Sequence, residues 1–103
     1  MYKFCFFVPE SHLESVKAAV FAAGAGKLGN YDMCSWQIKG EGQFRPLAES
    51  SPFTGQIGEL EHLAEYKVEI VCADECIAAA VEAMKTAHPY EEPAYGVFGM
   101  TEF

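Results

Sequence analysis

Two helical patterns, each lying between strand patterns, constrain the possible fold of this sequence more than any other feature. Apolar residues recur at helical spacing over residues 13–23 and again over residues 77–87. Runs that are rich in aromatic and β-branched residues, or that alternate between apolar and polar, flank these helices. They predict strands over residues 2–8, 31–39, 59–72 and 94–100. The predicted order of elements is therefore β-α-β-β-α-β.

That order predicts an α+β fold of the ferredoxin-like, split βαβ type. Each strand–helix–strand unit forms a right-handed crossover, so both helices cover the same face of a four-stranded antiparallel sheet. The chain has 103 residues, which is enough for one domain spanning 1–103. Half of its residues are hydrophobic, so we expect a well-formed core.

Capping residues set the predicted ends of the helices. Ser11 and Glu14 have the spacing of a capping box, in which Ser11 caps the first helix and Glu14 reaches back to it. Gly24 is expected to end that helix. Asp74 is expected to cap the second helix, which His88 and the following proline close.

Two connections between the predicted elements have unusual composition. The glycine-rich turn at 24–30 follows a helix and leads into a strand, which is the wrong context for a phosphate-binding fingerprint, although its backbone amides remain a minor candidate for an anion site. The run 40–42, Gly-Glu-Gly, is expected to interrupt the second strand, with 43–46 resuming in extended form. Residues 47–58 then predict a long polar loop. Loops of this length are usually functional or mobile, so this loop points most strongly to function.

One face of the predicted sheet has no helix to cover it. The alternation of the strands places Cys5, Phe7 and Val71 on that face, with part of the Val97/Phe98 pair. A monomer rarely exposes such an apolar patch to water. We therefore expect a homo-oligomer that packs its open sheet faces together.

The charge of the chain excludes several classes of partner. Fifteen acidic residues against seven basic ones give a formal net charge of −8, which argues against nucleic acid and anionic membranes. No apolar run approaches the length of a membrane helix, and the N-terminus lacks the cleavage site of a signal peptide. The four cysteines lie in apolar or helical segments and predict reduced thiols. A cytoplasmic protein is expected.

The run 88–93, His-Pro-Tyr-Glu-Glu-Pro, is the densest cluster of chemically capable residues. In one interpretation His88 and a glutamate, Glu91 or Glu92, bind a divalent metal or act as an acid–base pair. In the other, which we favour, His88 caps the second helix, the prolines fix the turn and Tyr90 packs as an anchor. Glu91 and Glu92 point to opposite sides of an extended backbone, which disfavours a shared ion.

The remaining candidates are scattered along the chain. Trp36 and Phe44 could stack on a ligand or lie in the core, and Glu61 belongs to an acidic group with Glu59, His62 and Glu65. No catalytic residue is assigned, because Ser35 lacks a suitably spaced histidine and Cys34 lacks a neighbouring basic residue. The full set of ligand or interface candidates is Gly26, Gly29, Tyr31, Cys34, Trp36, Phe44, Arg45, Glu61, His88, Tyr90, Glu91, Glu92 and Tyr95.

Two stretches resemble a known family. They are the glycine-rich and aromatic run over 26–36, continued at 40–46 and 55–58, and the run 88–95, His-Pro-Tyr-Glu-Glu-Pro-Ala-Tyr. Together they resemble the insert domain of the Nif-three-like (NGG-interacting factor) family, also called the YqfO family. The resemblance spans essentially the whole sequence. It implies a fold like that of CutA and the P-two signalling proteins, and it implies a trimer.

The resemblance also limits what activity to expect. Full-length members carry two flanking lobes whose histidines and carboxylates bind a metal pair, whereas this sequence has only His12, His62 and His88. We therefore expect no cyclohydrolase-like activity here. The favoured hypothesis is a non-catalytic oligomeric binding or regulatory module for a small molecule or a partner protein. The alternative is a CutA-like protein that binds a divalent metal through His88, Glu91 and Glu92.

Overall fold

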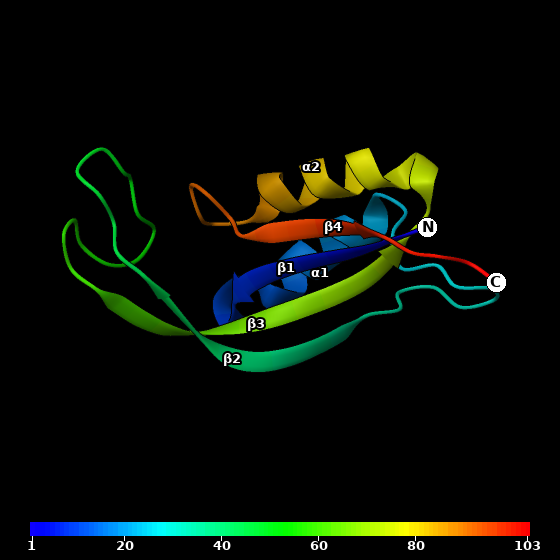
Figure 1. Ribbon diagram of the computed structural model, residues 1–103, viewed down its shortest axis with the longest axis horizontal. Helices are drawn as coiled ribbons and strands as arrows, with labels where there is room; N and C mark the ends of the chain where they lie inside the picture. The colour runs from blue at the N-terminus through cyan, green and yellow to red at the C-terminus, as the bar shows by residue number, and fades with distance from the viewer.

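A four-stranded antiparallel sheet with strand order β2-β3-β1-β4 forms the framework of the molecule (Figure 1). The computed structural model describes all residues from 1 to 103. Short 3₁₀ turns at Glu10–His12 and Asp74–Cys76 precede the two helices. The elements are β1 (Tyr2–Pro9), α1 (Leu13–Ala22), β2 (Trp36–Phe44), β3 (Glu61–Cys72), α2 (Ile77–Ala87) and β4 (Tyr95–Gly99). The predicted ferredoxin-like α+β fold is confirmed.

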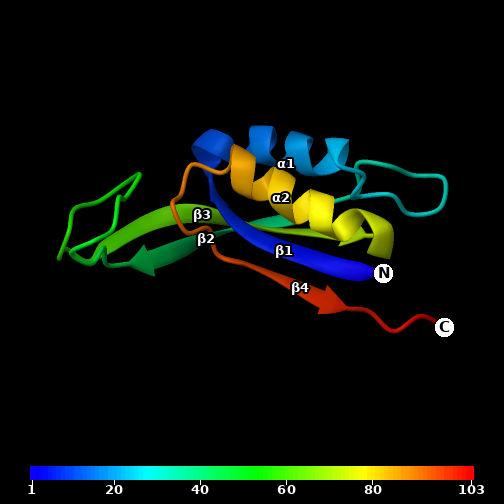
Figure 2. The same ribbon diagram turned by 90° about the horizontal axis from the view of Figure 1, so that it is seen from above.

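Both helices lie on the same face of the sheet, as Figure 2 shows from above. Alternate residues of the two central strands point toward the helices, so the core forms between these layers. The largest fully buried side chains there are Phe4, Phe6, Val8, Val16, Val20, Val68, Ile70, Cys72 and Met84. Neither helix is long and apolar enough to cross a membrane.

The predicted capping box at the first helix is wrong. The chain makes a 3₁₀ turn at Glu10–His12 first, so α1 begins only at Leu13, too late for Ser11 to serve as its N-cap. The Ser11 hydroxyl instead lies 2.8 Å from Nδ1 of His12, and Glu14 accepts a hydrogen bond from Lys17. The predicted stop is confirmed, because Gly24 follows the end of α1 with a φ of 108°.

Asp74 does not cap the second helix either. It lies in the 3₁₀ turn before α2, which begins at Ile77 without a side-chain cap. Its carboxylate pairs with the N-terminal ammonium group of Met1 instead. Because the 3₁₀ turn moves the start of the helix to Ile77, this carboxylate pairs with Met1, the residue before β1.

The position of the second strand also differs from the prediction. The segment 31–35 is not a strand but part of a turn closed by hydrogen bonds between Leu28 and Tyr31. β2 runs without interruption through the glycines at 40 and 42, because β3 is 12 residues long and pairs with all of it. Gly42 fits there for a steric reason, since a Cβ atom would lie 1.9 Å from Oε1 of Glu65.

The β2–β3 hairpin projects beyond the rest of the sheet. Pairing between β1 and β3 ends at Pro9 and Glu65, whereas β2 and β3 continue to pair as far as Phe44 and Glu61. We call the projecting part, residues 41–64, the arm (Figure 1). It contributes to a longest dimension of 47 Å.

The sheet face opposite the helices exposes apolar side chains, but not all of those predicted. Cys5 is buried, with an exposed fraction of 6%. Its cross-strand partner is Gly96, and the ring of Phe98 from the same strand as Gly96 lies over that glycine. The most exposed apolar side chains are Trp36, Ile38 and Phe98, each more than half exposed. The open face is therefore apolar mainly along the edge strand β2 and at β4.

Truncating a core side chain should lower stability strongly. Met84→Ala leaves a cavity between α2 and the sheet, and we expect the free energy of unfolding to fall by about 2–5 kcal/mol. Urea unfolding followed by circular dichroism measures this loss. The matched variant Met100→Ala, at a site that is 40% exposed, should change stability by less than about 0.5 kcal/mol. Equal losses in the two variants would contradict the assignment of the core.

Candidate ligand-binding site

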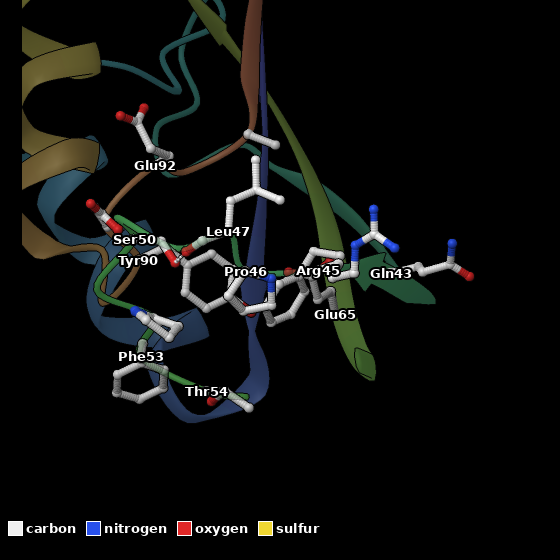
Figure 3. A pocket seen from close by; sticks show the side chains of 14 residues that line it. Gln43, Arg45, Pro46, Leu47, Ser50, Phe53, Thr54, Glu65, Tyr90 and Glu92 are labelled. Carbon is white, nitrogen blue, oxygen red and sulfur yellow. Dashed lines mark hydrogen bonds between the residues drawn. The ribbon is translucent and has the colours of Figure 1, made fainter. Parts of the chain in front are cut away.

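A pocket of about 410 Å³ lies at the base of the arm (Figure 3). One wall is the segment that follows β2, and the other is the segment between α2 and β4. Its volume falls within the range of small-molecule sites, roughly 300–1,000 Å³. The lining residues are Gln43, Phe44, Arg45, Pro46, Leu47, Ser50, Pro52, Phe53, Thr54, Glu65, Tyr90, Glu91, Glu92 and Ala94.

Specific contacts join the two walls. The backbone N–H of Ser51 donates a 2.7 Å hydrogen bond to Oε2 of Glu91. The Phe53 ring packs between His12 and Tyr90, with ring centroids 5.6 and 6.2 Å away. The long loop that the sequence singled out is therefore attached to the run 88–93, and together they enclose the pocket.

His88 has a structural position beneath this wall. Its side chain is buried, Nε2 donates to the carbonyl oxygen of Phe7 at 2.7 Å, and Nδ1 accepts from the N–H of Tyr90 at 3.1 Å. These bonds require the neutral tautomer with its proton on Nε2. Burial lowers the pKa of His88, outweighing the opposing effect of the Phe7 carbonyl. His88 thus fixes the start of the segment that carries Tyr90.

The predicted metal ligands are not assembled within the chain. Both ring nitrogens of His88 are occupied, and the Glu91 carboxylate is bound by Ser51. Nowhere does the chain bring three or more histidine, cysteine, aspartate or glutamate side chains together as a metal centre would require. His88, Glu91 and Glu92 do not form a complete metal site in one copy.

Tyr90 and Glu65 form the polar part of the pocket wall. The Tyr90 hydroxyl is buried without a hydrogen-bond partner in good geometry. Burial, and then the adjacent Glu65 carboxylate, raise the pKa of Tyr90, so the phenol keeps its proton. Sequence reasoning noted Glu65 only as part of an acidic group. Its place in the pocket follows from the register of β3, which puts it opposite Gly40 and beside Gly42.

The predicted candidate residues divide between two ends of the molecule. Those that line the pocket are Phe44, Arg45, Tyr90, Glu91 and Glu92, with His88 behind them. At the opposite end, Cys34 and Trp36 line a smaller hollow of about 220 Å³. Gly26, Gly29 and Tyr31 belong to the turn near that hollow, where the N–H of Gly26 donates to Val71.

Two further candidates lie outside both hollows. Tyr95 packs edge-on against Phe4, and the Lys85 ammonium group lies 5.1 Å from the centre of its ring. Glu61 lies on the arm, where its side chain occupies the space that a Cβ atom at Gly55 would take. Both residues have structural contacts that account for their positions.

His88 should make stability depend on pH. Because its folded pKa is lowered, the unfolded chain binds more protons below about pH 6.5, and stability falls as the pH drops from there toward the folded pKa. His88→Gln should remove this dependence, which corresponds to at most one proton. Urea unfolding at pH 7.5, 6.5 and 5.5 measures it. His62→Gln, at an exposed site beside Glu41, should keep the dependence, and an unchanged slope in His88→Gln would refute the assignment.

Comparison with known proteins gives a clear but partial match. No family model matches the sequence. It is 48% identical over 98 residues to a GTP cyclohydrolase 1 type 2 homolog of Mycobacterium leprae, covering 95% of this chain and 26% of that protein. A protein of the same description from Bacillus subtilis is 41% identical over 96 residues, again 26% of its length. The chain thus spans about a quarter of the length of the relatives it matches.

Solved structures agree with this picture. A Bacillus cereus protein related to NIF3 superposes with a TM-score of 0.84 and 37% identity, covering 98% of this chain and 26% of that one. The periplasmic divalent cation tolerance protein CutA of Archaeoglobus fulgidus superposes with a TM-score of 0.69 at 15% identity, covering all of this chain and 87% of CutA. The chain is therefore similar to one part of the NIF3-related proteins, and it has the fold of CutA.

Proposed function

We propose that this chain is a non-catalytic binding or regulatory module that acts as a homo-oligomer, favoured as a trimer, in the cytoplasm. In this proposal residues 1–103 form one domain, and the pocket at the base of the arm binds a small molecule. The pocket is the observation that carries the proposal. Two segments distant in sequence enclose it, and the Ser51–Glu91 hydrogen bond and the Phe53–Tyr90 contact hold them together.

The exposed sheet face supports the oligomer. Trp36 and Ile38 lie on the face opposite the helices, and both are more than half exposed. Their strand, β2, is nine residues long and forms an edge of the sheet, where its outer backbone groups lack a partner strand. A long apolar edge of this kind favours association with another copy. The free thiols of all four cysteines fit a reducing compartment.

We do not assign to this chain the activity that the name of its relatives describes. That name describes proteins of which the chain matches 26%. The pocket contains several carboxylates and one guanidinium group, a poor complement to a triphosphate. We therefore propose binding, rather than cyclohydrolase chemistry, as the role of this domain.

Charges placed on the open face should break the oligomer. The double variant Trp36→Glu/Ile38→Glu should sediment as a monomer, whereas the unaltered protein should sediment as a trimer, because the buried glutamates would lack partners. Analytical ultracentrifugation distinguishes these masses. Ile57→Glu makes the same kind of change on the exposed loop and should leave the trimer intact. An unaltered protein that is monomeric would contradict the proposal.

Filling the pocket should abolish ligand binding without unfolding the domain. Ala94 lines the pocket and is exposed, so Ala94→Phe places a ring in the cavity. We expect small aromatic fragments to shift the amide signals of Ser51 and Tyr90 in the unaltered protein, but not in Ala94→Phe. Two-dimensional ¹⁵N NMR measures these shifts. Ala79→Phe, on the exposed face of α2, should bind as the unaltered protein does, and equal binding by Ala94→Phe would place the ligand elsewhere.

A further inference from the structure

The geometry points to a particular chemical class of ligand for this pocket: a small, flat, largely apolar molecule with a cationic, forked N–H head group that binds the Glu65 carboxylate. This inference rests on the proposed function of the pocket as a ligand site. To that proposed function, the inference adds the sign of the ligand's charge and the residue that recognises the ligand.

The apolar walls determine the body of the ligand. Phe44, Pro46, Leu47, Phe53 and the ring of Tyr90 all line the cavity, and most of its lining surface is apolar. Aromatic rings and prolines offer flat apolar surfaces, which pack well against another ring. A cavity of about 410 Å³ accommodates one small ring system with a substituent.

The charged side chains of the pocket do not contribute equally. Arg45 provides the one cation of the lining, and Figure 3 shows its guanidinium group extending away from Tyr90 and Phe53. Glu92 also extends away from those two rings in Figure 3. The carboxylate of Glu91 is occupied by the N–H of Ser51. Glu91 keeps its charge but holds the loop through one oxygen, so Glu65 is the pocket carboxylate that neither holds the loop nor extends away from the rings.

Glu65 lacks a cationic partner in the chain. It is half-buried, and no lysine, arginine or histidine nitrogen lies within 4.0 Å of its carboxylate. The Glu65 carboxylate lies over Gly42, which has no side chain to block it, and the Tyr90 hydroxyl lies near this carboxylate. A carboxylate held against apolar walls is stabilised by a paired cation. A planar amidinium group matches its two oxygens with two N–H donors.

The net charge of the chain also favours a cationic ligand. The chain carries a formal net charge of −8, so its field attracts cations and repels phosphates and carboxylates. A ligand with an anionic head group would also meet Glu65 and Glu91 at short range. Both the carboxylates of the pocket and the net charge of the chain thus favour a positively charged ligand.

Three probes of nearly identical shape test the inference: benzamidine, benzamide and benzoate, which differ in charge. We expect benzamidine to shift the amide signals of Ser51 and Tyr90 and to bind at least roughly tenfold more tightly than benzoate, as for a charge-assisted hydrogen bond. Glu65→Gln should abolish this preference. Glu49→Gln removes the same charge from an exposed position that does not line the pocket, and should preserve it.

A second variant keeps the test independent of any structural role of Glu65. Gly42→Ala leaves the carboxylate in the chain but displaces it, because the new Cβ occupies its place. It should weaken benzamidine binding while the spectrum of the core stays unchanged. Benzoate binding in the pocket as tightly as benzamidine would overturn the charge assignment and leave the proposed ligand site standing. Failure of all three probes to shift Ser51 and Tyr90 would overturn both.

Discussion

The length and register of β3 determine most of this structure. Its 12 residues pair with β1 over one part and with β2 over another. Pairing Phe6 with Val68 turns the apolar residues of both strands toward the helices, and a shift of one residue would turn them away. The same register ends the contact with β1 at Glu65, so the strand continues into the arm with β2 alone. The pocket forms at this point of departure, where Glu65 meets the segment that returns from α2.

This arrangement explains why the pocket combines rigid and adjustable parts. Glu65 and Phe44 lie on paired strands, and Tyr90 is held by the buried His88 beneath it. The loop that closes the pocket, by contrast, is joined to the segment after α2 by the hydrogen bond from Ser51 to the Glu91 side chain and by the packing of Phe53, while its own ends are joined by the bond from Gly58 to Pro46. Sites built on strands hold their geometry closely, whereas loops open at lower free energy. In the proposed binding mode, a ligand enters by displacing the loop while the Glu65 carboxylate stays in place.

Sequence periodicity was sufficient for the fold but not for its local details. The order of apolar residues shows which face of each strand and helix is buried. That order gives the alternation in β1 and β3 and the helical spacing in α1 and α2. The capping box at Ser11 failed because a 3₁₀ turn shifted the start of the helix, which the residue types alone do not reveal. The sequence predicts an interruption at the glycines of β2, because the steric reason for Gly42, the Glu65 side chain, comes from another strand.

The sequence predicts the separate segments of the candidate site but not that they come together. The long loop and the run from His88 to Pro93 were both singled out, yet only tertiary structure shows that they face each other through Ser51 and Glu91. Native mass spectrometry of the protein, purified without added metal or nucleotide, tests the central claim of an oligomeric ligand-binding domain most directly. The account predicts the mass of a trimer, with a small added mass of up to one molecule per chain that is absent from a pocket-filled variant. A monomer without added mass would contradict it.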